Sequence, residues 1–239
     1  MSVFDRNKVK AVLKPIVEST YEAQQKEKDI YSNTLDCFSA VIDSSVRGVT
    51  LEEWKESEKQ RQAQKTLQNK IGDFHQRVLG TLDGVEDLGT GGIVDLVSDD
   101  HKIVAEIKNK WNTTKGNHKK SIYDDLEGVL NDDGKEGYEG FYVEMLPKNG
   151  QRYNDPFVPS DNTSSTRRES REDIRVIDGK TFYTKLTGDE NALEELYSLV
   201  PELTAEILEE SFGVKRDVND IKSNNIFPEL YNKIFPKDS

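Results

Sequence analysis

The sequence has little cysteine, little histidine and no long apolar run, and each shortage excludes a class of protein. Its single cysteine, Cys37, cannot form a disulfide within the chain, which is typical of a reducing compartment. The histidines and the cysteine show no zinc-ligand spacing. No run approaches the roughly 18 to 20 apolar residues of a membrane span, and no apolar signal-peptide segment follows the first charges. We therefore expect a cytoplasmic protein without a membrane segment.

A net positive charge is also missing. The chain has 33 lysines and arginines against 45 aspartates and glutamates, a formal charge of −12. This excludes a generic nucleic-acid coat protein, because the phosphate backbone repels a uniformly acidic surface. The charge is segregated, however: residues 101–120 carry six lysines and one acid, a local +5, and residues 121–140 carry seven acids and one lysine, a local −6. A nucleic-acid site is therefore expected at residues 101–120.

The first part of the chain has helical periodicity. With 239 residues, the chain can form one sizeable core with a helical extension. We predict a helix through Val9 and Ile16, interrupted or kinked near Pro15, a second over residues 30–44 and a third over residues 51–81. A capping box of Thr50 and Glu53 begins the third, whose polar middle faces solvent or a partner. Cys37 is interpreted as a core residue of the second.

After Gly80 the periodicity changes to that of strands. Residues 92–100 and 102–110 are predicted to form a β-hairpin with an aspartate-rich turn. Residues 121–131 and 189–211 have helical patterns, and residues 140–147 resemble a buried strand. Residues 174–188 are predicted as strand, turn and strand, with Asp178 and Gly179 at the turn. Residues 149–170 are interpreted as a long functional loop. These elements together predict a mixed α/β fold.

The predicted hairpin carries a polar face. Alternation places Glu106 and Lys108 on one face of the second strand, while Ile103, Ala105 and Ile107 point to the core. With a turn at residues 99 and 100, Asp95 would lie opposite Val104 and diagonal to Glu106, roughly 7 to 8 Å away. A slip of one residue would move Asp95 to the other face.

Two neighbouring carboxylates and a lysine suit one kind of chemistry. Carboxylates about 4 Å apart repel by something like 4 kcal/mol at an effective dielectric of 20, so they share a proton or hold a cation. Oxygen ligands favour Mg²⁺. Lys108, roughly 6.6 Å along the strand from Glu106, can point its ammonium at a phosphate or an attacking water. Metal, water and positive charge are what phosphodiester hydrolysis requires.

This pattern, Asp95-x10-Glu106-x-Lys108, resembles the active site of the PD-(D/E)XK nuclease superfamily, with GIVD at residues 92–95 in place of the usual Pro-Asp. The larger stretch IGDFHQRVLG, GGIVDL and AEIKNKWNTTKG, followed by a short helix, resembles the AvaII-like group of type II restriction endonucleases. The resemblance covers roughly residues 70–130.

The resemblance implies a restriction-endonuclease-like core, in which helices flank a central mixed β-sheet. It implies a homodimer that uses Mg²⁺ to cut both DNA strands at a short GC-rich palindrome of the GGNCC or GGWCC type. Asp95, Glu106 and Lys108 would be catalytic, with Asp95, Glu106 and the carbonyl of Ile107 around the metal. Such a restriction–modification system also implies a cognate DNA methyltransferase in the host.

Polar residues around the hairpin are candidate DNA contacts. His75 and Gln76 precede the hairpin, where a side chain could reach water or phosphate. Residues that follow the catalytic strand would contact backbone phosphates: Asn109, Lys110, Thr113, Thr114, Lys115, Lys119 and Lys120. The loop at residues 148–171 is the predicted base-reading segment, with Gln151, Arg152, Arg167 and Arg168 as its main candidates.

The sequence is expected to divide into an N-terminal helical region, residues 1–70, which dimerises or clamps DNA, and a nuclease domain, residues 71–239. Two other functions stay open at this point. One is a structure-selective or repair nuclease that uses the same site without reading bases. The other is a non-catalytic interaction protein in which the Glu-x-Lys spacing is accidental.

Overall fold

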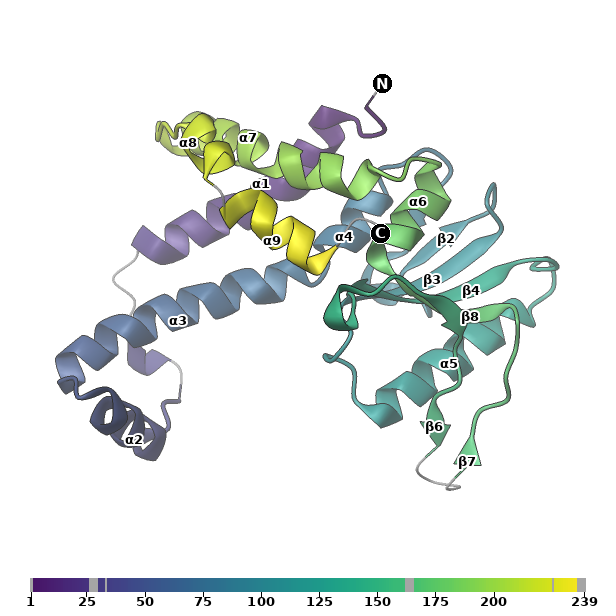
Figure 1. The fold of residues 1–239 in the computed structure, drawn as a ribbon, viewed down its shortest axis with the longest axis horizontal. Coiled ribbons are helices and arrows are strands. Elements are labelled where there is room, and N and C mark those ends of the chain that lie inside the picture. The colour runs from purple at the N-terminus through teal and green to yellow at the C-terminus, as the bar shows by residue number, and fades with distance from the viewer. Residues whose placement is uncertain (1, 26–29, 33, 162–165, 225, 236–239) are drawn as a thin grey trace.

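The computed structural model describes residues 2–25, 30–32, 34–161, 166–224 and 226–235, and these form a mixed α/β fold around one six-stranded sheet, as predicted (Figure 1). The pairs β3–β4 and β4–β8 are parallel, and the other neighbours are antiparallel. In sheet order the strands are β1 (Glu86–Asp87), β2 (Leu96–Ser98), β3 (Ile103–Lys110), β4 (Glu139–Leu146), β8 (Ile174–Asp178) and β5 (Asn154–Pro156).

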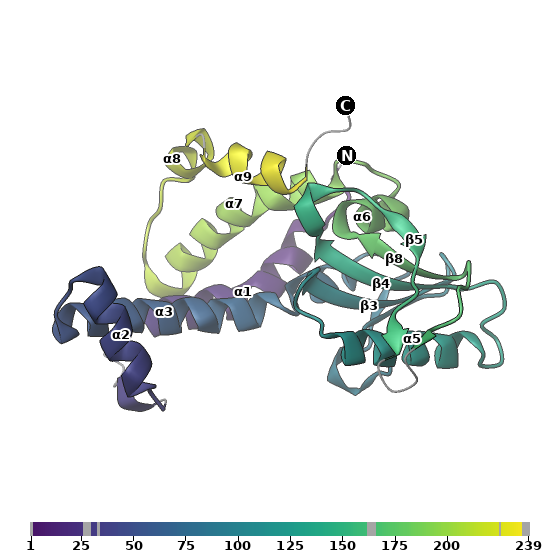
Figure 2. The ribbon, with the colours of Figure 1, turned by 60° about the horizontal axis from the view of Figure 1, so that its bottom comes forward.

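Helices cover both faces of the sheet (Figures 1 and 2). The helix α5 (Gly116–Leu130) lies on one face. The other face is covered by α1 (Arg6–Gln25), α4 (Phe74–Leu79), α6 (Gly179–Thr187) and α7 (Ala192–Phe212). The short helices α8 (Val218–Ser223) and α9 (Ile226–Ile234) return along α7, where Tyr197 stacks on Phe227 with 4.4 Å between ring centroids.

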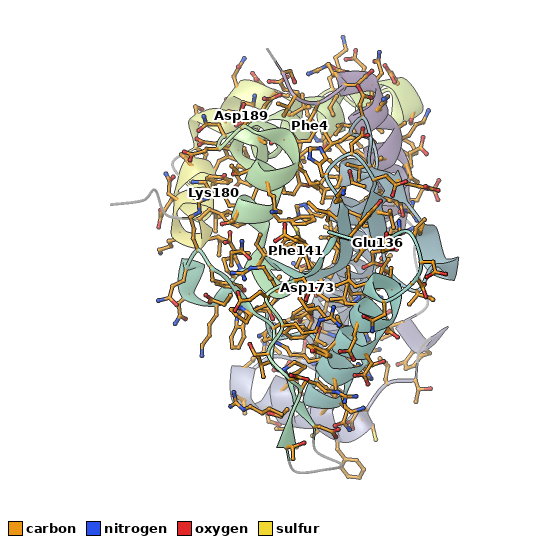
Figure 3. All side chains as sticks on the ribbon, turned by 90° about the vertical axis from the view of Figure 1, so that its right-hand side faces the viewer. Phe4, Glu136, Phe141, Asp173, Lys180 and Asp189 are labelled. Carbon is orange, nitrogen blue, oxygen red and sulfur yellow. The ribbon has the colours of Figure 1, made fainter. Side chains whose placement is uncertain are left out.

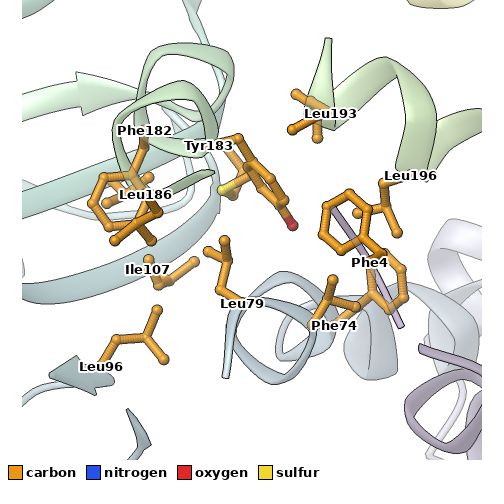
Figure 4. Close-up of a cluster of buried hydrophobic side chains, with 14 of the residues drawn as sticks. Phe4, Phe74, Leu79, Leu96, Ile107, Phe182, Tyr183, Leu186, Leu193 and Leu196 are labelled. Carbon is orange, nitrogen blue, oxygen red and sulfur yellow. The ribbon is translucent and has the colours of Figure 1, made fainter. Parts of the chain in front are cut away.

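The sheet is buried on both faces, so two apolar clusters form. In the larger one, Leu96 and Ile107 of the sheet meet side chains of α4, α6 and α7 (Figure 4). Phe141, labelled in Figure 3, has no exposed surface. The predicted core face of β3 is confirmed, because Ile103, Ala105 and Ile107 all belong to this cluster. The second cluster lies under α5.

The predicted single helix over residues 51–81 is wrong. The capping box is present, with the Glu53 amide donating to the Thr50 hydroxyl over 3.2 Å, but α3 (Leu51–Ile71) ends at Gly72 and α4 begins at Phe74. The polar helix α3 buries Glu58 alone, whereas α4 buries apolar side chains in the core. The chain turns at Gly72 and Asp73 because glycine and aspartate are poor helix formers.

The predicted strand, turn and strand over residues 174–188 is also wrong in its second half. Asp178 is the N-cap of α6, and its carboxylate accepts hydrogen bonds from the Thr181 amide at 3.0 Å and the Thr181 hydroxyl at 2.5 Å. Phe182 and Leu186 are then buried at helical spacing. A Cβ at Gly179 would lie 2.5 Å from the Met145 carbonyl oxygen, so glycine permits α6 to lie against β4.

Beyond α1, which packs on the core, the N-terminal helices form an arm that projects from the sheet (Figures 1 and 2). The helix predicted over residues 30–44 is replaced by a 3-10 turn, η1 (Ile30–Ser32), and a later helix, α2 (Cys37–Arg47), which Asp36 caps. Cys37 is exposed, contrary to the predicted core role, because it is the first residue of α2 and burial on that face begins only at Ala40. The first helix continues through Pro15 without interruption.

The remaining expectations are mostly confirmed. The strand predicted at residues 140–147 is β4, the helix at 189–211 is α7, and the helix at 121–131 begins earlier, at Gly116. The stretch interpreted as a loop contains β5 and a small antiparallel pair, β6 (Ser160–Asp161) and β7 (Thr166–Arg167). Residues 162–165 of that stretch lie outside the described residues. None of the described helices has the length and apolar character to cross a membrane.

His75 is part of the packing between α4 and α6. Its Nδ1 lies 3.0 Å from the Tyr183 hydroxyl, and its ring meets the edge of the Phe74 ring. Burial lowers the pKa of His75 to about 4. A partly buried imidazole with a tyrosine partner suits packing better than the contact with phosphate or water that we expected.

We expect His75 to make the stability depend on pH. Its folded pKa of about 4 lies below the unfolded value of about 6.5, so its contribution is complete above pH 6.5 and lost as the pH falls towards 4, by up to about 3 kcal/mol. Urea unfolding at pH 7.5 and 4.5 should show a smaller loss for His75→Gln than for the wild type. The exposed His101 provides the control, because His101→Gln should keep the wild-type loss. Equal losses in all three proteins would contradict this role.

Candidate active site

The pairing of β2 with β3 decides where Asp95 lies. Leu96 pairs with Ala105, and Val97 pairs with Val104, so partners add to 201 instead of the expected 199. Asp95 directly precedes β2 and donates from its amide to the Ala105 carbonyl at 3.0 Å, so it lies beside Ala105 and Glu106. Asp95 and Glu106 lie on the same face of the hairpin, as predicted. The pairing of the two strands is shifted by two residues from the register that we expected.

The difference comes from the turn. Ser98 ends β2 by donating from its hydroxyl to the Gly84 carbonyl at 2.7 Å and accepting from the His101 amide at 3.3 Å. Residues 99–102 therefore form a four-residue turn in place of the expected two, and Lys102 adopts a positive φ of 51°.

Asp95, Glu106 and Lys108 meet at this register. The Lys108 ammonium lies 2.6 Å from Glu106 Oε1 and 3.8 Å from Asp95 Oδ2. Asp95 Oδ2 also accepts a hydrogen bond of 2.7 Å from the Ile107 amide. All three side chains are partly buried, so the site has an orientation fixed by the strands and still opens to solvent.

Both carboxyl groups are harder to ionise than usual. Burial raises the pKa of Asp95, and the nearby Asp73 and Asp87 add to the rise, while the Ile107 amide and Lys108 oppose it. Burial also raises the pKa of Glu106, with the charge of Asp95 as the next cause. Lys108 therefore offsets only part of the repulsion between the carboxylates of Asp95 and Glu106. A bound cation would relieve the rest of this repulsion.

The residues present fit a divalent metal ion. Asp95 and Glu106 supply hard oxygen ligands from opposed positions, as Mg²⁺ prefers. The Ile107 amide points to Asp95, and the N–H and C=O of one strand residue lie at the same edge. The Ile107 carbonyl therefore faces the same side and can serve as the third ligand. Within the described residues no cluster of three acidic, histidine or cysteine side chains forms, so waters would complete the shell.

Gln76 lies beside the site and is partly buried. Its amide donates to Asp87 Oδ1 at 2.7 Å and to the Asp95 carbonyl at 3.4 Å. Asp87 also accepts from the Gly89 amide at 2.9 Å. Gln76 therefore connects α4 to the backbone of Asp95, which suits a positioning role better than the DNA contact that we expected.

The predicted phosphate contacts divide into two groups. Asn109 and Lys110 end β3, and Thr113, Thr114 and Lys115 follow between β3 and α5, where Lys110, Thr113 and Lys115 are exposed. The other two lysines lie on α5 and are bound to acids: Lys119 to Glu144 at 2.7 Å and Lys120 to Asp124 at 2.9 Å.

The predicted base-reading residues are likewise spread over different surroundings. Gln151 and Arg167 are exposed beside one groove. Arg168 lies 2.5 Å from Asp124, and Arg152 donates to the Thr181 hydroxyl at 3.2 Å. The structure therefore does not gather these side chains into one surface.

The sequence interpretation missed Glu144, a carboxylate on β4 that is buried next to the site. It pairs side by side with Lys108 across the parallel strands, so the two share a face. Its partners are Lys119 and the Tyr153 hydroxyl, which donates at 2.5 Å. The available signal was one charge within an otherwise apolar strand.

Comparisons with known proteins agree about the kind of protein that this chain resembles. A family model described as Eco47II restriction endonuclease matches residues 1–209. The type II restriction enzyme Eco47II of Escherichia coli is 40% identical over 189 residues, which are 78% of this chain and 79% of the relative. The type II restriction enzyme Sau96I of Staphylococcus aureus is 29% identical over 207 residues, 84% of this chain and 76% of the relative.

We expect divalent ions to stabilise this chain through Asp95 and Glu106. Free Mg²⁺ or Ca²⁺ at 100 times its dissociation constant should add about 2.7 kcal/mol to the free energy of unfolding. In thermal melts, Asp95→Asn combined with Glu106→Gln should abolish the shift. The control Asp132→Asn with Asp133→Asn removes two exposed charges and should keep it. An undiminished shift in the Asp95 and Glu106 variant would place the ion elsewhere.

Proposed function

Because the chain belongs to the Eco47II restriction endonuclease family, we propose that Asp95, Glu106 and Lys108 are the groups with which this type II restriction endonuclease cuts DNA. The observation that carries the proposal is the convergence of two partly buried carboxylates and one ammonium at the start of a strand hairpin. The arrangement supports membership of the PD-(D/E)XK superfamily.

Each residue has a role that its position suits. Asp95, Glu106 and the Ile107 carbonyl would hold Mg²⁺, which when bound supplies Lewis-acid stabilisation of phosphate charge and a more acidic water. Lys108 places a positive charge beside both carboxylates, where it can hold a water or a non-bridging phosphate oxygen. The Ile107 amide fixes Asp95 and prevents its carboxylate from turning towards Lys108 alone.

The substrate that we propose is double-stranded DNA with a short GC-rich palindrome of the GGNCC or GGWCC type, as the sequence resemblance implies. Lys110, Thr113 and Lys115 are exposed beyond the catalytic strand and suit backbone phosphates. An enzyme that cuts a short site also threatens the DNA of its host. We therefore propose that a cognate DNA methyltransferase protects those sites.

Removing either catalytic group should abolish cutting and leave the fold intact. We expect Asp95→Ala and Lys108→Ala to lower the cleavage rate of plasmid DNA with Mg²⁺ by about 100- to 1000-fold or more. Specific binding, measured with Ca²⁺ present, should survive. Asp133→Ala, an exposed change outside the site, should cut like the wild type. Unchanged cutting, or loss of the folded state, would refute the assignment.

The same digest separates the alternatives. Discrete plasmid fragments indicate cutting at one recognised sequence, and sequencing their ends gives that sequence and the cut position. A smear or junction-specific nicking would instead indicate a structure-selective or repair nuclease. Absence of cleavage with any divalent ion would indicate a non-catalytic protein. The similarity to two type II restriction enzymes favours the first outcome.

We propose that the N-terminal region, residues 1–70, makes the homodimer through α2, and that residues 71–239 carry the nuclease. Phe38, Ile42 and Val46 are 78%, 63% and 81% exposed, and they recur every four residues along one face of α2. No charged residue lies on that face, which disfavours a DNA clamp, because phosphates are bound by lysine and arginine. A two-fold axis near Ile42 would place Phe38 against the partner's Val46.

We expect Phe38→Glu with Ile42→Glu to convert a dimer of the 27.2 kDa chain into a monomer, because a charge would be buried in an apolar contact. Light scattering with a size-exclusion column gives the mass directly. Leu230→Glu changes a leucine on α9 that is 53% exposed and should leave the dimer intact. A wild-type monomer, or a dimer that survives the α2 changes, would contradict the proposed interface.

A further inference from the structure

An ion pair of one partly exposed lysine and one buried glutamate lies in a groove beside the candidate catalytic lysine. The groove has a volume of about 690 Å³, and its lining includes Lys119, Glu144 and Tyr153, with Trp111, Gln151 and Arg167 around them. Glu144 is the neighbour of Lys108 on the adjacent strand. DNA bound at Lys108 would therefore lie close to this groove.

The ammonium of Lys119 is held more firmly than that of an ordinary surface lysine. It lies 2.7 Å from Glu144 Oε1 and 5.1 Å from the centre of the Tyr142 ring. The second oxygen of Glu144 accepts from the Tyr153 hydroxyl at 2.5 Å. The side chain of Glu144 is 7% exposed and that of Lys119 is 29% exposed. The lysine alone of this pair is accessible to a ligand.

Stability does not account for this arrangement, because a buried ion pair is often no better than apolar side chains of the same size. Attraction to phosphate does not account for it either. The carboxylate cancels the charge of the lysine, so the pair attracts an anion weakly. The pair does fix the orientation of the Lys119 ammonium. An ammonium has three hydrogen-bond donors, and Glu144 accepts one of them.

We propose that Lys119, positioned by Glu144 and Tyr153, reads a guanine of the recognised sequence in the major groove. Guanine presents two neutral acceptors there, O6 and N7, which match the two remaining donors of the lysine. Adenine offers one acceptor and a donor, so it matches less well. A lysine already ordered in the free protein also loses less side-chain entropy on binding.

This inference rests on the proposed function, and it changes the role that we expected for Lys119. A phosphate contact weakens binding to all sequences alike when it is removed, whereas a base contact changes one position. Lys115, the N-cap of α5, is exposed and begins the same helix. It is the matched control for a phosphate contact.

The test uses the recognised sequence obtained from the ends of a wild-type digest. Duplexes are made in which each guanine of that sequence is replaced, one at a time, by 7-deazaguanine, which lacks the N7 acceptor. For the wild type, kcat/KM should fall by about 5-fold or more at one guanine. The double variant Lys119→Met with Glu144→Gln removes both charges and leaves no unpaired buried carboxylate. In this variant, 7-deazaguanine at that one position should no longer lower kcat/KM relative to guanine.

Two single variants separate positioning from contact. Glu144→Gln keeps the ammonium and should reduce the penalty at the same guanine, and Tyr153→Phe should do so more weakly. Lys115→Met should lower binding to every duplex and flatten the salt dependence by about one unit. A penalty that persists in the double variant, or that falls equally at all guanines, overturns the inference. A wild type without discrete fragments overturns the proposed function itself.

Discussion

The hydrogen bond from the Ile107 amide to the Asp95 carboxylate is the interaction on which the candidate site depends. Asp95 precedes β2 and would otherwise have several side-chain orientations. The bond ties it to the strand that carries Glu106 and Lys108, so three groups from two strands have one geometry. The bond fixes the orientation of the Asp95 carboxylate. Asp95 is also partly buried, which raises its pKa. A site prepared in this way loses little entropy when it binds a cation.

The basic segment of the sequence does not form a correspondingly basic surface in the folded protein, because acidic side chains lie beside several of its lysines. The basic segment at residues 101–120 suggested a broad positive surface, but α5 brings the following acidic segment onto the same helix. Lys120 meets Asp124 one turn later, and Lys119 meets Glu144 from β4. Three of the six lysines of that segment are exposed: Lys102, Lys110 and Lys115. Compensation of this kind leaves a small basic area next to the hairpin on an otherwise acidic molecule.

Local patterns predicted the parts of the fold that local physics decides. Alternation identified β3 and its core face, a capping box located the start of α3, and an isolated charge pattern identified Asp95, Glu106 and Lys108 as one group. The register of the hairpin could not be predicted, because Ser98 is held by the carbonyl of Gly84 in a distant loop. Asp178 and Gly179 have the composition of a hairpin turn, and only packing against Met145 shows that they begin a helix. Glu144 was missed because its partners come from α5 and a loop.

The polar helix α3 buries almost nothing, yet it has 21 residues and is therefore about 31 Å long. In the dimer proposed through α2, α3 would act as a spacer whose length contributes to the separation of the two catalytic centres. One turn of helix is about 5.4 Å, whereas successive nucleotides of one strand are about 3.4 Å apart. Both protomers carry the change, so adding or removing a turn would alter the separation by up to about 11 Å, or about three base pairs. In the proposed dimer, the stagger between the two cuts would then depend on the number of residues in this helix.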